Sequence, residues 1–198
     1  ATVDRAAVEE ARRLARDGRA EAAAQRYRQI FGNQPPTEPY ALEYYQTLSG
    51  TEAGRAEGQR GLAQLAGRPS APDRARLAYA QSLTYTANTR ADGIRRLAEL
   101  ADRPEVAQEA RQSWRAAIGF AGNDPAAAPQ IEAYLQRYPD DADLRRRLET
   151  LRAQPAAAPA DPNAATRQSA FSRLEAGGSA GNTEAARGFE AVLAANPN

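Results

Sequence analysis

The segment RAEGQRGLAQLAGRP at residues 55–69 returns as RADGIRRLAELADRP at residues 90–104, with ten of fifteen positions identical. The two copies are 35 positions apart, and their glycine, leucine and proline residues fall in the same places. A repeat of this length is typical of stacked units, each of which buries its apolar face only against its neighbours. The chain is therefore predicted to bind partners through an extended surface rather than to enclose a catalytic site.

Each copy carries apolar residues three or four positions apart, followed by a proline. In the first copy Leu62 and Leu65 precede Pro69. This spacing places the apolar side chains on one face of a helix, and the proline ends the helix because it cannot donate the next backbone hydrogen bond. A looser form of the pattern ends at three more prolines, namely Pro35, Pro139 and Pro197.

The unit is thus a helix, a turn and a second helix of about 34–35 residues, which resembles the tetratricopeptide repeat. The predicted fold is all-α: a tetratricopeptide-repeat solenoid of antiparallel helix pairs, with one extra unpaired helix and a linker. Turns within the pairs are expected at four polar or glycine-containing positions: Asp17-Gly18, Asn88-Thr89, Asn123-Asp124 and Gly181-Asn182. The apolar positions predict a continuous core with six large members: Leu62, Leu65, Leu83, Leu97, Leu100 and Trp114.

The spacing of the prolines sets the expected layout. Residues 1–139 are predicted to form four helix-pair repeats, and residues 164–198 a fifth, as part of a longer array. Residues 140–153 carry leucines on one face and are predicted to form the extra helix, whereas the Pro/Ala-rich residues 154–163 read as an extended linker. This region is either a hinge or a degenerated repeat without a mechanical role.

The composition excludes most catalytic chemistry. The chain contains no cysteine, no histidine and no lysine, so disulfides, the usual zinc sites, histidine-based triads and Schiff-base chemistry are not available. The adjacent acidic pairs, such as Asp140-Asp141, point in different directions on a helix. We therefore expect no enzyme activity, no catalytic residues, no metal and no cofactor.

Charge and hydropathy also limit the partners. The 26 basic residues are all arginine and are balanced by 25 acidic residues, which leaves a net charge of +1. Nucleic-acid binding calls for a strongly basic face, so it is not expected. No stretch approaches the ~20 apolar residues of a membrane span.

Two long segments and one short one carry a resemblance to a known family. These are LEYYQTLSGTEAGRAEGQRGLAQLAGRP at 42–69, LAYAQSLTYTANTRADGIRRLAELADRPEV at 77–106, and QSWRAAI at 112–118. They resemble the periplasmic tetratricopeptide-repeat region of the cellulose export component of bacterial cellulose synthase, the component designated C. The resemblance covers about residues 39–152.

The resemblance implies a periplasmic array that is joined, in the full-length protein, to an outer-membrane barrel through which the glucan leaves. It implies protein subunits of the cellulose synthase complex as partners, with the glucan chain or peptidoglycan as further candidates. It brings no catalytic residues with it.

The first helix of each pair lines the concave face of such a solenoid, which is the usual binding surface. Aligning the repeats places seven candidate binding residues on this face: Tyr40, Glu43, Thr47, Ser82, Tyr85, Ser113 and Phe120. The aromatic members could stack on sugar rings or hold a peptide. The alternative is that Tyr85 and Phe120 belong to the core, as is expected more strongly for Tyr44, Tyr79 and Trp114.

Two functions remain open. The array is either a scaffold that positions proteins between synthase and exporter, or a carbohydrate-binding conduit that guides the nascent glucan. A conduit predicts exposed aromatic side chains aligned along a groove, whereas a scaffold predicts an exposed apolar or charged patch without such a row of aromatic side chains. A third interpretation is a repeat scaffold of another exopolysaccharide exporter or of a cytosolic complex.

Overall fold

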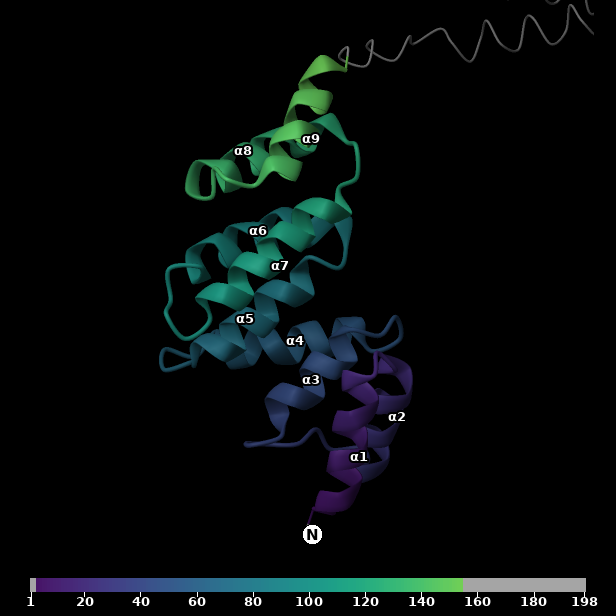
Figure 1. Cartoon of the computed structure of the whole chain (residues 1–198). Helices are drawn as coiled ribbons and strands as arrows, with labels where there is room; N and C mark the ends of the chain where they lie inside the picture. Colours follow the sequence, from purple (N-terminus) through teal and green to yellow (C-terminus); the bar gives the residue numbers. More distant parts are fainter. Residues whose placement is uncertain (1–2, 155–198) are drawn as a thin grey trace, which may run out of the picture. The chain divides into compact units, whose positions relative to one another are not determined.

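The computed structural model describes residues 3–154, and these residues form α-helices and one short 3-10 helix, with no strand among them (Figure 1). The all-α prediction is confirmed. The elements run as follows along the chain: α1 Arg5–Arg16, α2 Ala20–Phe31, α3 Ala41–Ser49, α4 Arg55–Ala66, α5 Asp73–Leu83, α6 Ala87–Leu100, α7 Ala107–Phe120, η1 Pro125–Ala127, α8 Ala128–Arg137 and α9 Ala142–Ala153.

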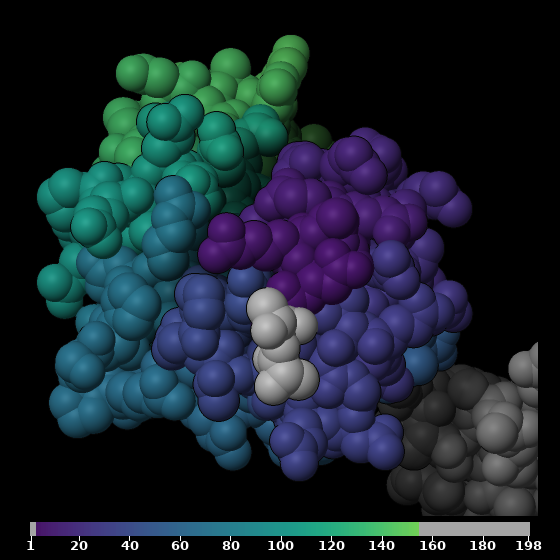
Figure 2. Space-filling model, turned by 90° about the horizontal axis from the view of Figure 1, so that it is seen from below, coloured from purple at the N-terminus to yellow at the C-terminus, as the bar shows by residue number. Residues whose placement is uncertain are grey.

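Each helix packs mainly on its neighbours in the chain. Helix α1 packs on α2, α3 on α4, and α5 on α6, and these helices are linked in turn by contacts of α2 with α3, α4 with α5 and α6 with α7. The space-filling view shows the side chains of α1, in purple, against those of the helices that follow (Figure 2). The apolar faces are therefore buried between successive helices, as in solenoid proteins.

The helix ends follow the sequence signals at most positions. Four helices end two to four residues before Pro35, Pro69, Pro104 and Pro139. At the start of α1 the carboxylate of Asp4 accepts hydrogen bonds from the backbone N–H of Ala6 (3.0 Å) and Ala7 (3.2 Å), which caps the helix. The expected turn at Asp17-Gly18 is present, and Gly18 adopts a φ of 74°.

The turn predicted at Asn88-Thr89 is wrong. Helix α6 begins at Ala87, so both residues lie in its first turn, and the connection from α5 lies at residues 84–86. The hydroxyl of Thr89 donates a hydrogen bond to the carbonyl oxygen of Leu83 (2.7 Å), which ties the start of α6 to the end of α5. A polar residue in the first turn of a helix can thus stabilise the loop that precedes the helix.

All six large residues predicted for the core are buried, and most of the buried apolar residues fall into three clusters. One cluster joins α1, α2 and α3, a second joins α3, α4 and α5, and a third extends from α5 to α9. Leu62 and Leu83 are buried without belonging to any of the three. Tyr45 of α3 packs against both the first and the second cluster, and α3 and α4 pack closely together.

That close packing depends on two glycines of α4. A Cβ atom at Gly58 would lie 2.4 Å from the backbone nitrogen of Ser49, and a Cβ atom at Gly61 would lie 2.2 Å from the ring of Tyr45. The two helices therefore approach each other where α4 has no side chain.

Helix α9 occupies most of the segment expected to form the extra helix, residues 140–153. Its three buried leucines, Leu144, Leu148 and Leu151, belong to the same cluster as α7 and α8. All but the first residue of the linker predicted at residues 154–163 lies outside the described residues, as do the repeat predicted at residues 164–198 and the turn predicted at Gly181-Asn182.

Leu97→Ala is expected to lower the free energy of unfolding by about 2–5 kcal/mol, because Leu97 is fully buried between α6 and its neighbours and the truncation leaves a cavity. Chemical denaturation followed by circular dichroism measures the loss. Glu99→Ala, on the exposed face of the same helix, should change it by no more than about 0.5 kcal/mol. Equal effects of the two variants would contradict the burial of Leu97.

Candidate functional site

Two large apolar side chains of residues 3–154 are exposed, and both line the same hollow. Tyr85 is 42% exposed and Phe120 is 56% exposed. With Gly50, Arg55 and Arg90 they surround a space of about 500 Å³, which we call the Tyr85–Phe120 hollow. The interpretation of these two side chains as core residues is therefore wrong.

The hollow is formed by equivalent positions of successive helix pairs. Gly50 follows the last residue of α3, Tyr85 lies two residues after α5, and Phe120 ends α7, in steps of 35 residues. Arg55 is the first residue of α4, and Arg90 lies in the first turns of α6, again 35 residues on. The site thus lies at the connections between the first and the second helix of each pair.

Arg90 is held in place by two contacts. Its Nε donates a hydrogen bond to the carbonyl oxygen of Thr84 (3.1 Å), and its guanidinium carbon lies 5.8 Å from the centre of the Phe120 ring. A guanidinium group at this distance from an aromatic ring is attracted to it. The side chain is therefore positioned at the hollow by Thr84 and Phe120 rather than by a carboxylate.

Arg55, unlike Arg90, has no hydrogen bond from its Nε to any of the described residues, and this Nε is buried. Burial of the hydroxyl end of Tyr85 raises the pKa of Tyr85, and the positive charge of Arg55 acts in the opposite direction. Arg55 and Tyr85 are therefore close enough to interact electrostatically.

Glu43 is engaged in a structural network. Its carboxylate accepts hydrogen bonds from the Nε (2.7 Å) and one Nη (2.9 Å) of Arg12 and from the hydroxyl of Tyr27 (3.0 Å). These bonds connect α1, α2 and α3, and the bond to Glu43 raises the pKa of Arg12. Thr47 lies beside this network and lines a second hollow of about 410 Å³.

The other predicted residues do not line the Tyr85–Phe120 hollow. Tyr40 is half-buried and packs on Phe31, with ring centres 5.7 Å apart. Ser113 is half-buried, and its hydroxyl accepts a hydrogen bond from the side-chain amide of Gln81 (2.8 Å). Ser82 is fully buried, and its hydroxyl donates to the carbonyl oxygen of Tyr79, so it offers no surface to a ligand.

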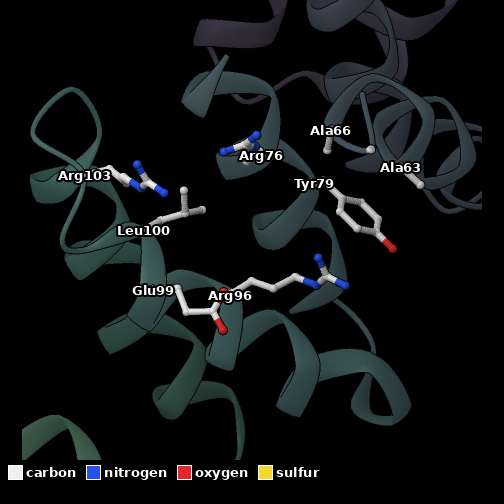
Figure 3. A pocket seen from close by; sticks show the side chains of 9 residues that line it. Ala63, Ala66, Arg76, Tyr79, Arg96, Glu99, Leu100 and Arg103 are labelled. Atoms are coloured by element: carbon white, nitrogen blue, oxygen red, sulfur yellow. The ribbon is translucent and has the colours of Figure 1, made fainter. Parts of the chain in front are cut away.

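A third hollow, of about 400 Å³, lies between α4, α5 and α6. Figure 3 shows Arg76, Tyr79 and Arg96 facing the same space. The guanidinium carbon of Arg96 lies 5.1 Å from the centre of the Tyr79 ring. Tyr79 is half-buried rather than a core residue, whereas Tyr44 and Trp114 are buried as expected.

The Tyr85–Phe120 hollow offers binding rather than reaction chemistry. It presents two aromatic faces and two guanidinium groups, which suit stacking and hydrogen bonding to oxygen atoms. Across residues 3–154 no three acidic residues lie close enough together to hold a metal ion, and no helix there is long and apolar enough to cross a membrane.

The sequence analysis did not single out Arg55 and Arg90. The sequence did contain a signal for these two arginines. Arg55 begins the first copy of the repeat (RAEG) and Arg90 begins the second (RADG), and they are 35 residues apart, as Tyr85 and Phe120 are. Their closeness to the aromatic side chains depends on how the second helix of one pair meets the first helix of the next.

Residues 3–154 thus form an all-helical fold in which successive helices stack on their neighbours, and two exposed aromatic side chains share one hollow. No protein-family model matches the chain, and no solved structure matches it. Two curated proteins do.

The chain is 40% identical over 170 residues to cellulose synthase operon protein C of Xanthomonas axonopodis pv. citri (strain 306), and 33% identical over 171 residues to cellulose synthase operon protein C of Komagataeibacter xylinus. Each match covers 84% of this chain but only 11% and 13%, respectively, of the two relatives. The resemblance is confirmed as a similarity to cellulose synthase operon protein C, and the chain is related to a segment of that protein.

Proposed function

We propose that the chain is part of a periplasmic repeat scaffold in a cellulose synthesis and export complex. In this role it mediates protein interactions between the synthase and the outer-membrane exporter, and it performs no catalysis itself. The observation that carries the proposal is the similarity, over most of the chain, to cellulose synthase operon protein C.

The fold supports a scaffold role. Because the helices bury their apolar faces between neighbours, their remaining faces are open along the described part of the chain. Repeat proteins of this kind use such extended surfaces to bind proteins. Arg55 and Arg90, two half-buried arginines that line the Tyr85–Phe120 hollow, support the proposal because they offer positive charge to a protein partner.

A photo-crosslinking experiment in the bacterium that makes the full-length protein tests the proposal. Replacing Phe120 with p-benzoylphenylalanine should give, on irradiation, a crosslink to another protein of the cellulose synthase complex, identified by mass spectrometry. The same replacement at Arg60, which is exposed on α4, is the matched control. Equal labelling at both positions, or no protein crosslink at Phe120, would contradict the scaffold role.

A carbohydrate-binding conduit is the second candidate, and the exposed aromatic side chains of Tyr85 and Phe120 favour it. Calorimetric titration with cellohexaose distinguishes the two. Saturable heat that disappears in Tyr85→Ala and Phe120→Ala would support the conduit, whereas no heat at millimolar sugar would leave the scaffold.

A further inference from the structure

The Tyr85–Phe120 hollow carries positive charge that the described part of the protein does not neutralise. Its lining includes Arg55 and Arg90 but no acidic residue. Neither arginine forms an ion pair with a carboxylate among residues 3–154, although many other arginines there do, as Arg12 does with Glu43. The hollow is thus a local site of positive potential.

The hollow around Tyr79 shows the contrast. It too combines arginine with an aromatic ring (Figure 3), but Arg76 is paired with Asp73 (3.5 Å) and Arg96 with Asp92 (3.0 Å), two residues not labelled in that view. Glu99 also lines that space. The charges of these two arginines are therefore balanced by acidic residues of the protein, whereas within residues 3–154 the charges of Arg55 and Arg90 are not.

Arg55 also lacks a hydrogen-bond acceptor. Its buried Nε has no partner among the described residues, and a buried donor without a partner costs free energy. A carboxylate suits the guanidinium groups of Arg55 and Arg90 that line the hollow, because its two oxygens match the geometry of such a group.

The volume of the Tyr85–Phe120 hollow and its aromatic lining indicate which groups the ligand carries besides a carboxylate. A space of about 500 Å³ is much larger than a small inorganic anion, which would leave the rings of Tyr85 and Phe120 uncovered. A neutral sugar would cover the rings but leave both positive charges unbalanced. A peptide segment that places an acidic group next to an apolar side chain satisfies both features.

We infer that this hollow is a docking site for an extended segment of a partner protein in which a carboxylate lies beside an apolar or aromatic side chain. The carboxylate pairs with Arg55 and Arg90, and the apolar group packs on Tyr85 and Phe120. This inference rests on the proposed scaffold function and names the chemistry of the segment that the scaffold would hold.

The test starts from a phage-displayed library of random 12-residue peptides selected on the immobilised 198-residue chain. The enriched sequences should share Asp, Glu or a free C-terminal carboxylate within three positions of an aromatic or large aliphatic residue. A synthetic peptide with this consensus is then titrated by calorimetry against the protein and its variants.

Arg55→Gln and Arg90→Gln are each expected to weaken binding at least tenfold, while Arg60→Gln, an exposed arginine on the same helix as Arg55, should change it less than twofold. Replacing the acidic group of the peptide by its amide should remove binding. Thermal unfolding of each variant verifies that the fold is retained.

Three outcomes would overturn the inference: no shared sequence after selection, a consensus without an acidic group, or binding that is insensitive to both arginine variants. Cellohexaose binding that is lost in Tyr85→Ala but kept in Arg55→Gln and Arg90→Gln would also overturn it, by assigning the hollow to sugar. A protein crosslink at Phe120 combined with a failed peptide test would leave the scaffold function standing and remove only this ligand chemistry.

Discussion

Replacing Trp114 with alanine is expected to lower the free energy of unfolding by about 3–5 kcal/mol, the range found when large aromatic residues are removed from a core. Trp114 is only 2% exposed. Its ring lies edge-on to Tyr134, with centres 5.0 Å apart, and to Tyr138, at 6.1 Å. The alanine variant would leave a large cavity between α7 and α8 and remove both aromatic contacts.

Phe120→Ala is the matched control, because Phe120 lies on the same helix but is 56% exposed. It should change the free energy of unfolding by no more than about 0.5 kcal/mol. Urea denaturation followed by circular dichroism measures both variants. Losses of similar size at the two positions would show that the face of α7 assigned to the core is wrong.

Gly58→Ala is expected to destabilise the protein by about 1–3 kcal/mol, although alanine is normally the better helix former. The added Cβ atom would lie 2.4 Å from the backbone nitrogen of Ser49 and 2.6 Å from the carbonyl oxygen of Tyr45. Because these are backbone atoms of α3, no side-chain rotation relieves the overlap, and the two helices must move apart.

Gly119→Ala provides the opposite expectation. Gly119 lies in the last turn of α7, and a Cβ atom there would meet no atom beyond its own stretch of helix within 4 Å. This variant should gain up to about 0.5 kcal/mol of stability from the better helix propensity of alanine, the lower end of the range for a helix centre. Thermal and urea denaturation of the two variants should therefore shift in opposite directions, and a stabilising effect of Gly58→Ala would contradict the close contact of α3 and α4.

The sequence predicted the helices well because their signals are local. Leu97 and Trp114 are buried where the apolar spacing places them, and helices end before the prolines because proline cannot continue them. The turn predicted at Asn88-Thr89 was wrong because polar residues occur both in loops and in the first turn of a helix, and the sequence alone does not distinguish the two. The atoms that Gly58 and Gly61 meet, in Tyr45 and Ser49 of α3, were also not predictable, since they depend on how two helices pack.

The candidate site was predicted only in part. The 35-residue step placed Tyr85 and Phe120 in equivalent positions, and the structure brings them to one hollow. Arg55 and Arg90 belong to the following helices, so their place beside these rings depends on the packing between successive helices. Ser82 shares the predicted face of α5 but is buried there, where its carbonyl oxygen accepts a hydrogen bond from the Gln59 side chain of α4 (2.8 Å).

The packing of helices on their chain neighbours also determines how the described part can fold. Because few of these contacts join residues distant in the chain, little loop-closure entropy must be lost before the first helices are stabilised, and topologies of this kind fold rapidly. Each helix pair can add to a preceding one, so folding can proceed in the order in which the chain is synthesised. Damage at one end should likewise spread only as far as the next interface, leaving the more distant helices protected in hydrogen exchange.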